Sequence, residues 1–261
     1  MRGEPPLLAF ERARSWVYSR RGLATLMNLI LLDPADFVAE GRVILRDRRH
    51  AHVRQVHRAA VGDNLRVGLV GGRLGSATIL ALDDAALELA VTLVDDPPPP
   101  LAITVVLALP RPHSLRKVLQ QATAMGVKRF VCFRCARVEP SFFTASAARP
   151  PGLDEELRLG LEQARDTVLP RVEVHPQPFH RFLAEVWPTL PEGQVLIAHP
   201  EPGAAACPRA VAGPVTLVVG PEGGFIPAEA ARLRELGSLI ELGPRILRVE
   251  TAVIALLARL S

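Results

Sequence analysis

The chain contains 261 residues, more than the roughly 150 typical of one domain, so one large domain or two smaller ones are both open. Its 49% hydrophobic and 22% charged residues exclude a disordered, collagen-like or disulfide-scaffold protein. No uninterrupted apolar run reaches the roughly 18 residues of a membrane-spanning helix, and we expect no membrane partner. The net charge of +4 is uneven, because residues 1–26 hold five arginines against two glutamates.

The N-terminal segment 1–26 has two competing interpretations. Arg20 and Arg21 before an apolar stretch resemble an export signal, but residues 33–37 offer no small-residue cleavage site. We favour an extension outside the folded body or a misplaced start, with Met27 as the alternative start. Residues 28–32 then form the first strand.

Three cysteines raise the question of redox or metal chemistry. Cys132 and Cys135 have the C-x-x-C spacing of thiol enzymes and zinc sites, but Cys207 is distant and no second pair completes four ligands. In a strand, residues three apart point to opposite faces. We interpret all three as reduced, buried side chains of a cytoplasmic protein and expect no metal site.

Four consecutive prolines at 97–100 divide the chain. Before them, apolar residues alternate over 87–93, and predicted strands at 65–70 and 76–81 flank a turn at Gly71 and Gly72. Short strands at this density predict a small β-barrel domain over residues 27–96.

Residues 101–261 alternate between strand and helix patterns, which predicts an α/β domain with a mostly parallel sheet. The predicted strands span 101–109, 130–135, 194–198, 215–219 and 238–242, and the predicted helices include 153–168 and 249–260. A further helix between the first two strands buries Leu115, Val118, Leu119, Ala122 and Met125.

Positive charge is concentrated within the barrel domain. Residues 42–73 carry eight arginines against two aspartates, a local charge of +6. Residues 48–60 predict a helix with Val53 inward and His50 and Arg54 outward, a face suited to phosphate oxygens, although a merely solvated basic face fits the pattern equally well. The candidate RNA-binding residues are Arg42, Arg46, Arg49, Arg54 and Arg58.

Two loops near the C-terminus predict a ligand site. The strand 215–219 enters a loop at 220–224 with three glycines, which let a ligand approach the backbone closely. The strand 238–242 enters a second loop at 243–248. Neither loop is a phosphate or dinucleotide motif, so the spacing predicts only that some ligand binds at this sheet edge.

The last predicted helix, 249–260, is apolar on all sides, with Glu250 and Arg259 as its charged residues. A central core helix explains this pattern. A helix shared between the core and a subunit interface explains it as well.

Residues 220–224 and 242–252 match, almost letter for letter, the two signature stretches of a known family. Further similarity lies at 52–58, 108–110 and 120–127, so the resemblance covers about residues 27–261. The chain resembles the 16S rRNA (uracil-N3)-methyltransferases (RsmE) of the SPOUT class. The resemblance implies a PUA-like RNA-binding barrel and a SPOUT domain with a trefoil knot. It also implies a homodimer and 16S rRNA or the small ribosomal subunit as partner.

The resemblance implies S-adenosyl-L-methionine (SAM) as methyl donor, without a metal. Its site would include Ile197, Ala198, His199, Gly220, Glu222, Gly223, Gly224, Leu242, Gly243, Ile246, Leu247 and Arg248.

The acceptor atom, uridine N3, carries a proton at neutral pH, so methylation needs a base or a polarising donor. Arg248 and Gln163 are the catalytic candidates for orienting the uracil or a phosphate, and Glu222 is expected to brace its own loop. Asp166 stands where the family has an arginine. This departure concerns the RNA side of the site more than the SAM side.

Three alternatives stay open from the sequence. The first is a SPOUT methyltransferase acting on another RNA atom, such as a ribose 2′-oxygen. The second is a non-catalytic RNA-binding or ribosome-assembly factor. A thiol oxidoreductase using Cys132 and Cys135 is a remote third.

Overall fold

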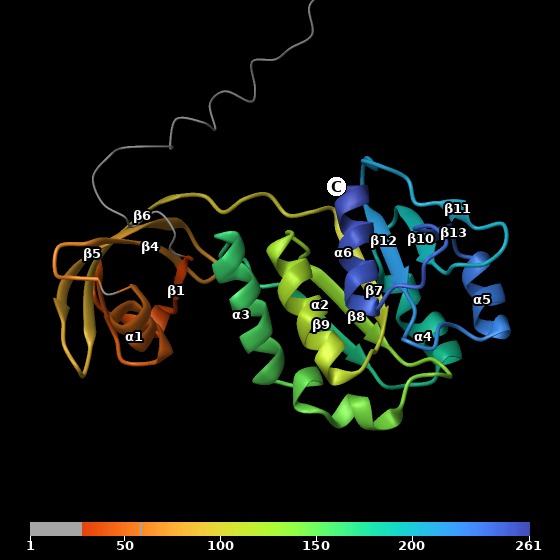
Figure 1. Cartoon of the computed structure of the whole chain (residues 1–261), viewed down its shortest axis with the longest axis horizontal. Helices are drawn as coiled ribbons and strands as arrows, with labels where there is room; N and C mark the ends of the chain where they lie inside the picture. The colour runs from red at the N-terminus through yellow and green to blue at the C-terminus, as the bar shows by residue number, and fades with distance from the viewer. Residues whose placement is uncertain (1–27, 58) are drawn as a thin grey trace, which may run out of the picture.

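A computed structural model describes residues 28–57 and 59–261, arranged as two sheets with their helices (Figure 1). The expectation for residues 1–26, the start at Met27 and the RNA-binding candidate Arg58 lie outside the described residues. Within the part described, no helix is long and apolar enough to cross a membrane.

The N-terminal domain is a curled six-stranded sheet with the strand order β1-β4-β5-β6-β3-β2. Its strands are β1 (Ile30–Leu32), β2 (Phe37–Ala39), β3 (Arg42–Leu45), β4 (Asn64–Leu69), β5 (Leu74–Leu82) and β6 (Leu87–Asp95). Only β1 and β4 pair in parallel among these strands, and β4 and β5 meet across the predicted glycine turn. Alternate residues such as Leu87 and Leu89 are buried, as the period-two pattern predicted.

The helix predicted over 48–60 is shorter than expected. Asp47 caps α1 (Arg48–His52) by accepting a hydrogen bond from the Arg49 amide at 2.9 Å, and a π-helical turn follows over Val53–His57. Val53 is buried, as predicted. The outward placement of His50 was wrong, because its ring is buried and lies 2.9 Å from the Asp83 carbonyl oxygen.

The C-terminal domain confirms the predicted α/β class with a seven-stranded sheet of order β11-β13-β10-β12-β7-β8-β9, in which every pairing is parallel. Its strands are β7 (Ile103–Ala108), β8 (Arg129–Phe133), β9 (Arg171–His175), β10 (Gln194–Ala198), β11 (Ala205–Ala206), β12 (Val215–Val219) and β13 (Ser238–Glu241). Its α-helices are α2 (Pro112–Ala124), α3 (Gly152–Ala164), α4 (Phe179–Glu185), α5 (Pro227–Arg234) and α6 (Val249–Leu260).

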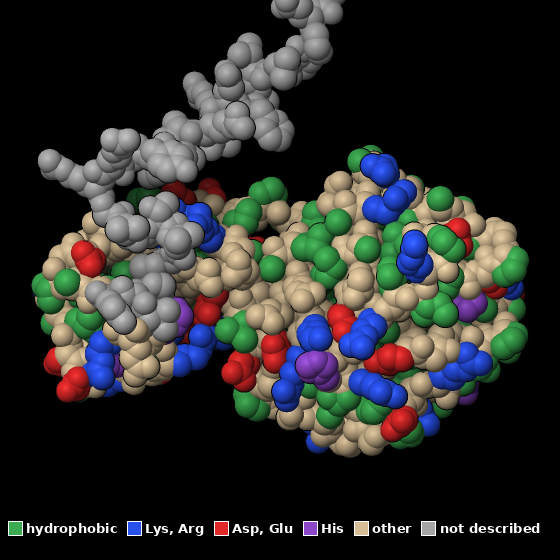
Figure 2. Space-filling view, viewed as in Figure 1, with side chains coloured by type: hydrophobic (Ala, Val, Ile, Leu, Met, Phe, Trp, Pro, Cys, Tyr) green, Lys and Arg blue, Asp and Glu red, His purple; other side chains and the backbone are tan. Residues whose placement is uncertain are grey.

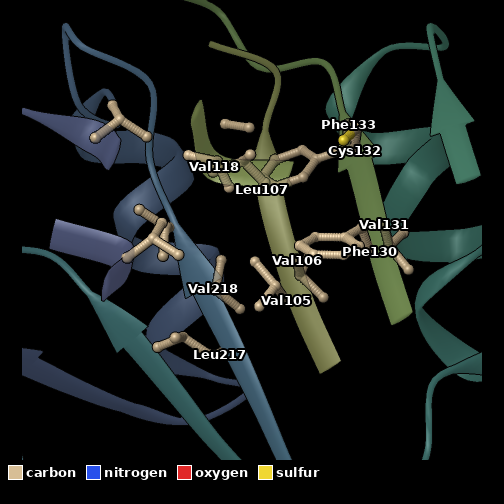
Figure 3. Close-up of a cluster of buried hydrophobic side chains, with 14 of the residues drawn as sticks. Val105, Val106, Leu107, Val118, Phe130, Val131, Cys132, Phe133, Leu217 and Val218 are labelled. Carbon is tan, nitrogen blue, oxygen red and sulfur yellow. The ribbon is translucent and has the colours of Figure 1, made fainter. Parts of the chain in front are cut away.

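The core of this domain lies on the central strands β7, β8 and β12 (Figure 3). All six residues of β7 are buried, as the continuous apolar run of a central parallel strand requires. The Phe133 ring from β8 stacks on Phe182 of α4 with centroids 4.7 Å apart. Helix α2 packs between α3 and α6 along one side of the sheet (Figure 1).

The helix predicted over 153–168 ends early, at Ala164. Arg165 adopts the left-handed conformation (φ 58°) that terminates the helix, and Val168 is exposed rather than buried. Asp166 is buried just beyond this end, where its carboxylate accepts hydrogen bonds from Lys128 Nζ at 2.6 Å and the Val168 amide at 3.0 Å. Asp166 therefore has a structural role in this chain.

The loop between β10 and β12 reaches across the end of α6. The Ala210 amide donates to the Arg259 carbonyl at 2.8 Å, and the Val211 amide donates to the Leu260 carbonyl at 3.0 Å. The Arg259 guanidinium in turn donates to the Cys207 carbonyl at 2.8 Å. The C-terminal helix is therefore held against a chain segment about 50 residues earlier in the sequence.

The two domains meet where β1 lies beside the end of α3. Leu29 and Leu31 pack on Leu161, and the Leu29 amide donates to the Glu162 carbonyl at 3.0 Å. On the neighbouring turn, the Thr167 hydroxyl donates to the Gly72 carbonyl at 2.6 Å. Backbone and apolar contacts thus fix the position of one domain on the other.

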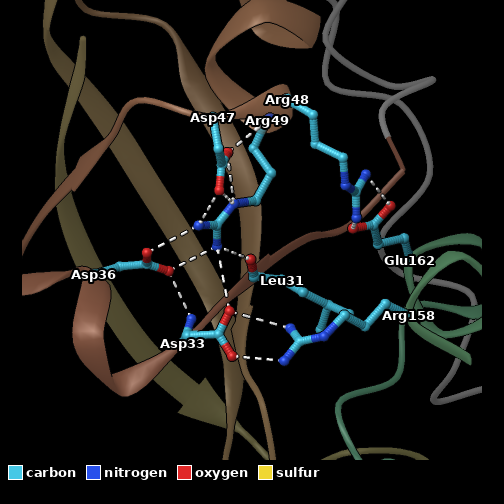
Figure 4. A network of polar contacts seen from close by, with 8 residues as sticks. All are labelled: Leu31, Asp33, Asp36, Asp47, Arg48, Arg49, Arg158 and Glu162. Carbon is cyan, nitrogen blue, oxygen red and sulfur yellow. Dashed lines mark hydrogen bonds and ion pairs between the residues drawn. The ribbon is translucent and has the colours of Figure 1, made fainter. Parts of the chain in front are cut away.

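Ion pairs complete this domain interface (Figure 4). Arg158 of α3 makes a two-pronged pair with Asp33 at 2.8 and 3.1 Å. Arg48 of α1 pairs with Glu162 at 2.6 Å. Both contacts are charge-assisted hydrogen bonds, which are stronger than neutral ones and fix orientation.

Candidate active site

A cavity of about 330 Å³ opens at the carboxyl ends of β10, β12 and β13, where the two glycine-containing loops lie side by side. This is the edge at which open parallel sheets bind ligands. Residues Val249, Ala252 and Leu256 of α6 contribute an apolar wall. The cavity therefore combines backbone-rich loops with an apolar surface, as small-molecule sites commonly do.

Most residues predicted for the SAM site line this cavity. They are Ala198, His199, Gly220, Glu222, Gly223, Gly224, Leu242, Gly243, Ile246 and Leu247. Two predicted residues do not line it. Ile197 is fully buried in β10, and Arg248 is exposed at the cap position before α6.

Two glycines give the loops shapes that other residues adopt with strain. Gly224 has φ +68° and Gly243 has φ +112°, and each would leave an added Cβ in open space. The requirement at these positions is therefore backbone conformation, not lack of room. The loops that carry them present peptide groups to the cavity.

Two carboxylates hold the loops in place. Glu222 accepts a hydrogen bond from the Arg111 amide at 3.0 Å, so its side chain holds the 220–224 loop against the β7–α2 connection. Glu229, buried in α5, accepts from the Ile226 amide at 3.2 Å and from the Ala136 amide at 2.7 Å. Each carboxylate thereby ties segments that are distant in the sequence to the cavity rim.

His199 lies on the β10 side of the cavity. Its ring is 5.9 Å from the Phe225 ring, centroid to centroid, and its Nε2 is 3.6 Å from a carboxylate oxygen of Glu201. The imidazole is thus fixed between an aromatic ring and an acidic group at the edge of the site.

Neither candidate for the acceptor chemistry lines the cavity. Gln163 is exposed near the end of α3, beside the domain interface, and Arg248 is exposed before α6. Arg137, which sequence analysis did not select, does line the cavity. It lies after β8 and contacts Gly223, which is 86 residues further along the chain.

The three cysteines form neither a redox site nor a metal site among the described residues. Burial raises the pKa of Cys132 to about 12, and burial together with Glu229 raises the pKa of Cys135 to about 12. Such thiols are neutral and inert at physiological pH. The prediction that they are buried and reduced is confirmed, and among the described residues no group of three or more His, Cys, Asp or Glu side chains is placed to hold a metal.

The candidate RNA-binding arginines differ in their surroundings. Arg42 is exposed and pairs with Glu88, Arg54 is partly buried and pairs with Asp84, and Arg46 is exposed. On the face in Figure 2, Lys and Arg side chains are interspersed with acidic ones over both domains. The basic segment is therefore partly neutralised by carboxylates of the same domain.

Arg49 is part of the framework instead of the solvated surface (Figure 4). Its side chain is 11% exposed, and its guanidinium donates to Asp36 at 2.6 and 2.8 Å and to the Leu31 carbonyl at 2.7 Å. Burial opposes its charge, but Asp47 and Asp36 raise the pKa of Arg49 above its usual range. Arg49 holds α1, β1 and the β1–β2 connection together.

The fold and the cavity define a mixed α/β protein with two sheets and a candidate small-molecule site at the edge of the parallel one. The family model described as RNA methyltransferase domain matches residues 97–261. A curated ribosomal RNA small subunit methyltransferase E from Mycobacterium bovis is 30% identical over 211 residues, covering 77% of this chain and 79% of that protein. The protein of the same name from Treponema pallidum is 27% identical over 240 residues, 88% of each chain. The chain belongs to the ribosomal RNA small subunit methyltransferase E family of RNA methyltransferases.

Solved structures share the fold. A ribosomal RNA small subunit methyltransferase E from Neisseria gonorrhoeae, bound to S-adenosyl methionine, superposes with a TM-score of 0.68 at 22% identity over 89% of this chain and 95% of that one. A methyltransferase from Legionella pneumophila with bound SAM gives a TM-score of 0.67 at 22% identity over 89% and 96%.

Proposed function

We propose that this protein methylates N3 of a uridine in 16S rRNA of the small ribosomal subunit, with SAM as methyl donor, in the cytoplasm. The observation that carries the proposal is the glycine-lined cavity at the ends of β10, β12 and β13 in a chain of this family. Relatives named for small-subunit rRNA methylation support the substrate class. Two neighbours of the same fold hold SAM.

The cavity fits SAM in size and chemistry. Its volume of about 330 Å³ lies at the lower end of the range for small-ligand pockets. Peptide groups of 220–224 and 242–247 would bind the adenine and methionyl polar atoms, and Ala252 and Leu256 would contact apolar portions. Bound SAM supplies an electrophilic methyl group. The chain contributes positioning and exclusion of water, which account for much of the acceleration in such transfers.

Gln163 and Arg248 retain a proposed role in orienting the uracil or an adjacent phosphate from outside the cavity. Both are exposed, and Gln163 lies where the two domains meet. RNA lying across this junction would contact the α3 end and the N-terminal domain together. Ile197 would act by holding the β10 loop from the core.

The N-terminal domain is proposed to be a PUA-like RNA-binding barrel, with Arg42, Arg46 and Arg54 contacting phosphates. Asp84, the partner of Arg54, is 99% exposed, so phosphate could displace it at little cost. Arg58 stays in the proposal from the sequence alone, and Arg49 would act indirectly by fixing α1.

The C-terminal domain is proposed to be a SPOUT domain whose chain end forms a trefoil knot. The contacts of Ala210 and Val211 with the end of α6 support this, because the β10–β12 loop crosses that helix. We also propose a homodimer through α6, in which Val253 and Leu257 are buried in the core while Ile254 and Ala255 are only partly covered.

Calorimetry with SAM, followed by methylation of small subunits that lack N3-methyluridine, tests the function. We expect SAM to bind and labelled methyl groups to enter 16S rRNA at uridine N3. Transfer to a ribose oxygen would identify a SPOUT enzyme of another specificity. Failure to bind SAM would favour the non-catalytic assembly factor.

A further inference from the structure

Arg137 is the basic side chain most firmly attached to the cavity rim. Its guanidinium donates to the Gly223 carbonyl, and its aliphatic atoms lie 3.1–3.8 Å from the position that a Cβ at Gly223 would take. The stem therefore covers the glycine loop while the charged end remains at the exposed mouth of the cavity.

The segment that carries Arg137 is fixed at both of its ends. Ala136, its predecessor, donates its amide to the buried Glu229 at 2.7 Å. Its successor Val138 is buried and donates its amide to the Cys135 carbonyl at 3.1 Å. A long side chain on such a segment has a defined starting direction, as a site residue requires.

The other charged side chains of the lining are less suited to a developing anion. Glu222 and Glu241 are carboxylates, and Glu222 is already bonded to the Arg111 amide. Arg245 also lines an adjoining hollow formed by 200–204 and 241–246, so it faces two spaces. Arg137 alone among these four combines positive charge with a hydrogen bond to the 220–224 loop.

We propose that Arg137 is a catalytic residue that holds the target uracil at the cavity mouth and stabilises the anion formed when N3 loses its proton. This inference rests on the proposed function. One guanidinium N–H bonds Gly223, which leaves other N–H donors for a uracil carbonyl oxygen. The anion spreads its charge over the carbonyl oxygens beside N3, where a fixed cation is most effective.

Arg137 acts as an electrostatic stabiliser and not as the base, because a guanidinium stays protonated throughout. The N3–H bond breaks and the proton passes to solvent. The N3 electron pair forms the bond to the methyl carbon as the carbon–sulfur bond breaks, and its electrons remain on sulfur in S-adenosylhomocysteine. The methylated uracil is neutral, so the interaction with Arg137 weakens in the product.

The test compares Arg137→Ala and Arg137→Lys with Arg232→Ala, an exposed arginine of α5 that pairs with Glu235 away from the cavity. We expect Arg137→Ala to lower kcat about 100-fold, the usual loss for one such donor, and to leave the calorimetric Kd for SAM within twofold. Arg137→Lys should restore part of the rate, and Arg232→Ala should match the wild type.

A second measurement separates this role from a structural one. 5-Fluorouridine has a more acidic N3–H than uridine, so its N3 anion needs less stabilisation. With RNA that carries 5-fluorouridine at the target, the loss in kcat caused by Arg137→Ala should be at least tenfold smaller. In a ¹⁹F NMR titration of this RNA bound with S-adenosylhomocysteine, N3 should lose its proton at a pH one to two units lower with wild type than with Arg137→Ala, which corresponds to the 10- to 100-fold effect.

Equal N3 titration in the two proteins, or an unchanged defect with 5-fluorouridine, would overturn the assignment. So would a shift that follows Arg245→Ala and not Arg137→Ala. If the proposed function itself fails, the wild type will not methylate uridine N3 at all, which is a different result from a defect confined to Arg137 variants.

Discussion

The pair between Arg158 and Asp33 lets the energetics of the domain interface be calculated and tested. Two hydrogen bonds of 2.8 and 3.1 Å join these side chains, which are 28% and 35% exposed. A fully exposed pair contributes about 0.2–1 kcal/mol, and a buried charged hydrogen bond about 1.5–3 kcal/mol. Partial solvent screening places the expected coupling between these ranges, at about 1 kcal/mol.

Urea unfolding of the wild type, Arg158→Ala, Asp33→Ala and the double variant measures this coupling directly. Asp33→Ala should cost more than Arg158→Ala, because Asp33 also lies 3.8 Å from Arg49. Arg181→Ala is the matched control, since it breaks an exposed pair with Glu185 within one helix and should cost at most about 0.5 kcal/mol.

The same variants should affect RNA and SAM differently. Loss of the Arg158 contact should raise KM for small subunits while the Kd for SAM stays unchanged, because the cavity lies on other elements. The effects of independent substitutions on the free energy of unfolding add to within about 0.3 kcal/mol. A coupling energy below this value would therefore show that Arg158 and Asp33 do not stabilise the interface as a pair.

Three further outcomes are expected. Cys132 and Cys135 should resist a thiol reagent at pH 8 in the native protein and react after unfolding, because thiols with pKa values of about 12 are almost entirely protonated at this pH. Rapid labelling of the native protein would contradict their burial. Asp166→Ala should destabilise the protein by about 1.5–3 kcal/mol in urea, because Lys128 loses its carboxylate partner and keeps only the Val168 carbonyl as acceptor. SAM binding should not weaken, and a loss below about 1 kcal/mol would show that the pair is not needed. The pKa of Glu250 is lowered below the usual 4.5, chiefly by a hydrogen bond from its own backbone amide. The stabilisation of the fold by the ionised Glu250 is therefore complete above pH 4.5 and is lost as the pH falls through the lowered pKa. Glu250→Gln should therefore lose less stability than the wild type on acidification, and parallel losses in the two proteins would contradict this.

Patterns that depend on local periodicity were predicted well. The helix 249–260 matches α6 at both ends, and the strands 194–198 and 215–219 match β10 and β12. The two glycine loops were expected to lie side by side, and they do form one cavity. In each case the deciding signal is continuous in the sequence, either an apolar run or a strand that ends in glycine.

Features decided by distant contacts were missed. The buried His50 ring lies within hydrogen-bond distance of the Asp83 carbonyl oxygen. Arg49 forms an ion pair with Asp36, which is 13 residues away in the sequence. Helix α3 stops at Arg165, before the predicted end, as Asp166 turns inward to Lys128. Such pairings depend on how the domains pack, which periodicity does not contain.

The catalytic candidates show the same limit. Gln163 and Arg248 were selected as polar residues of signature stretches, and both lie outside the cavity lining. Arg137 follows β8, and only the parallel order β12-β7-β8 brings that strand end near the 220–224 loop. A sheet order deduced in advance would have been the signal that indicated it.

The most direct test of the central claim is nucleoside mass mapping of 16S rRNA from native small subunits of a strain that lacks this protein. The account predicts that N3-methyluridine disappears from one position and returns when the wild-type gene is restored. Persistence of N3-methyluridine in the deletion strain would contradict the assignment.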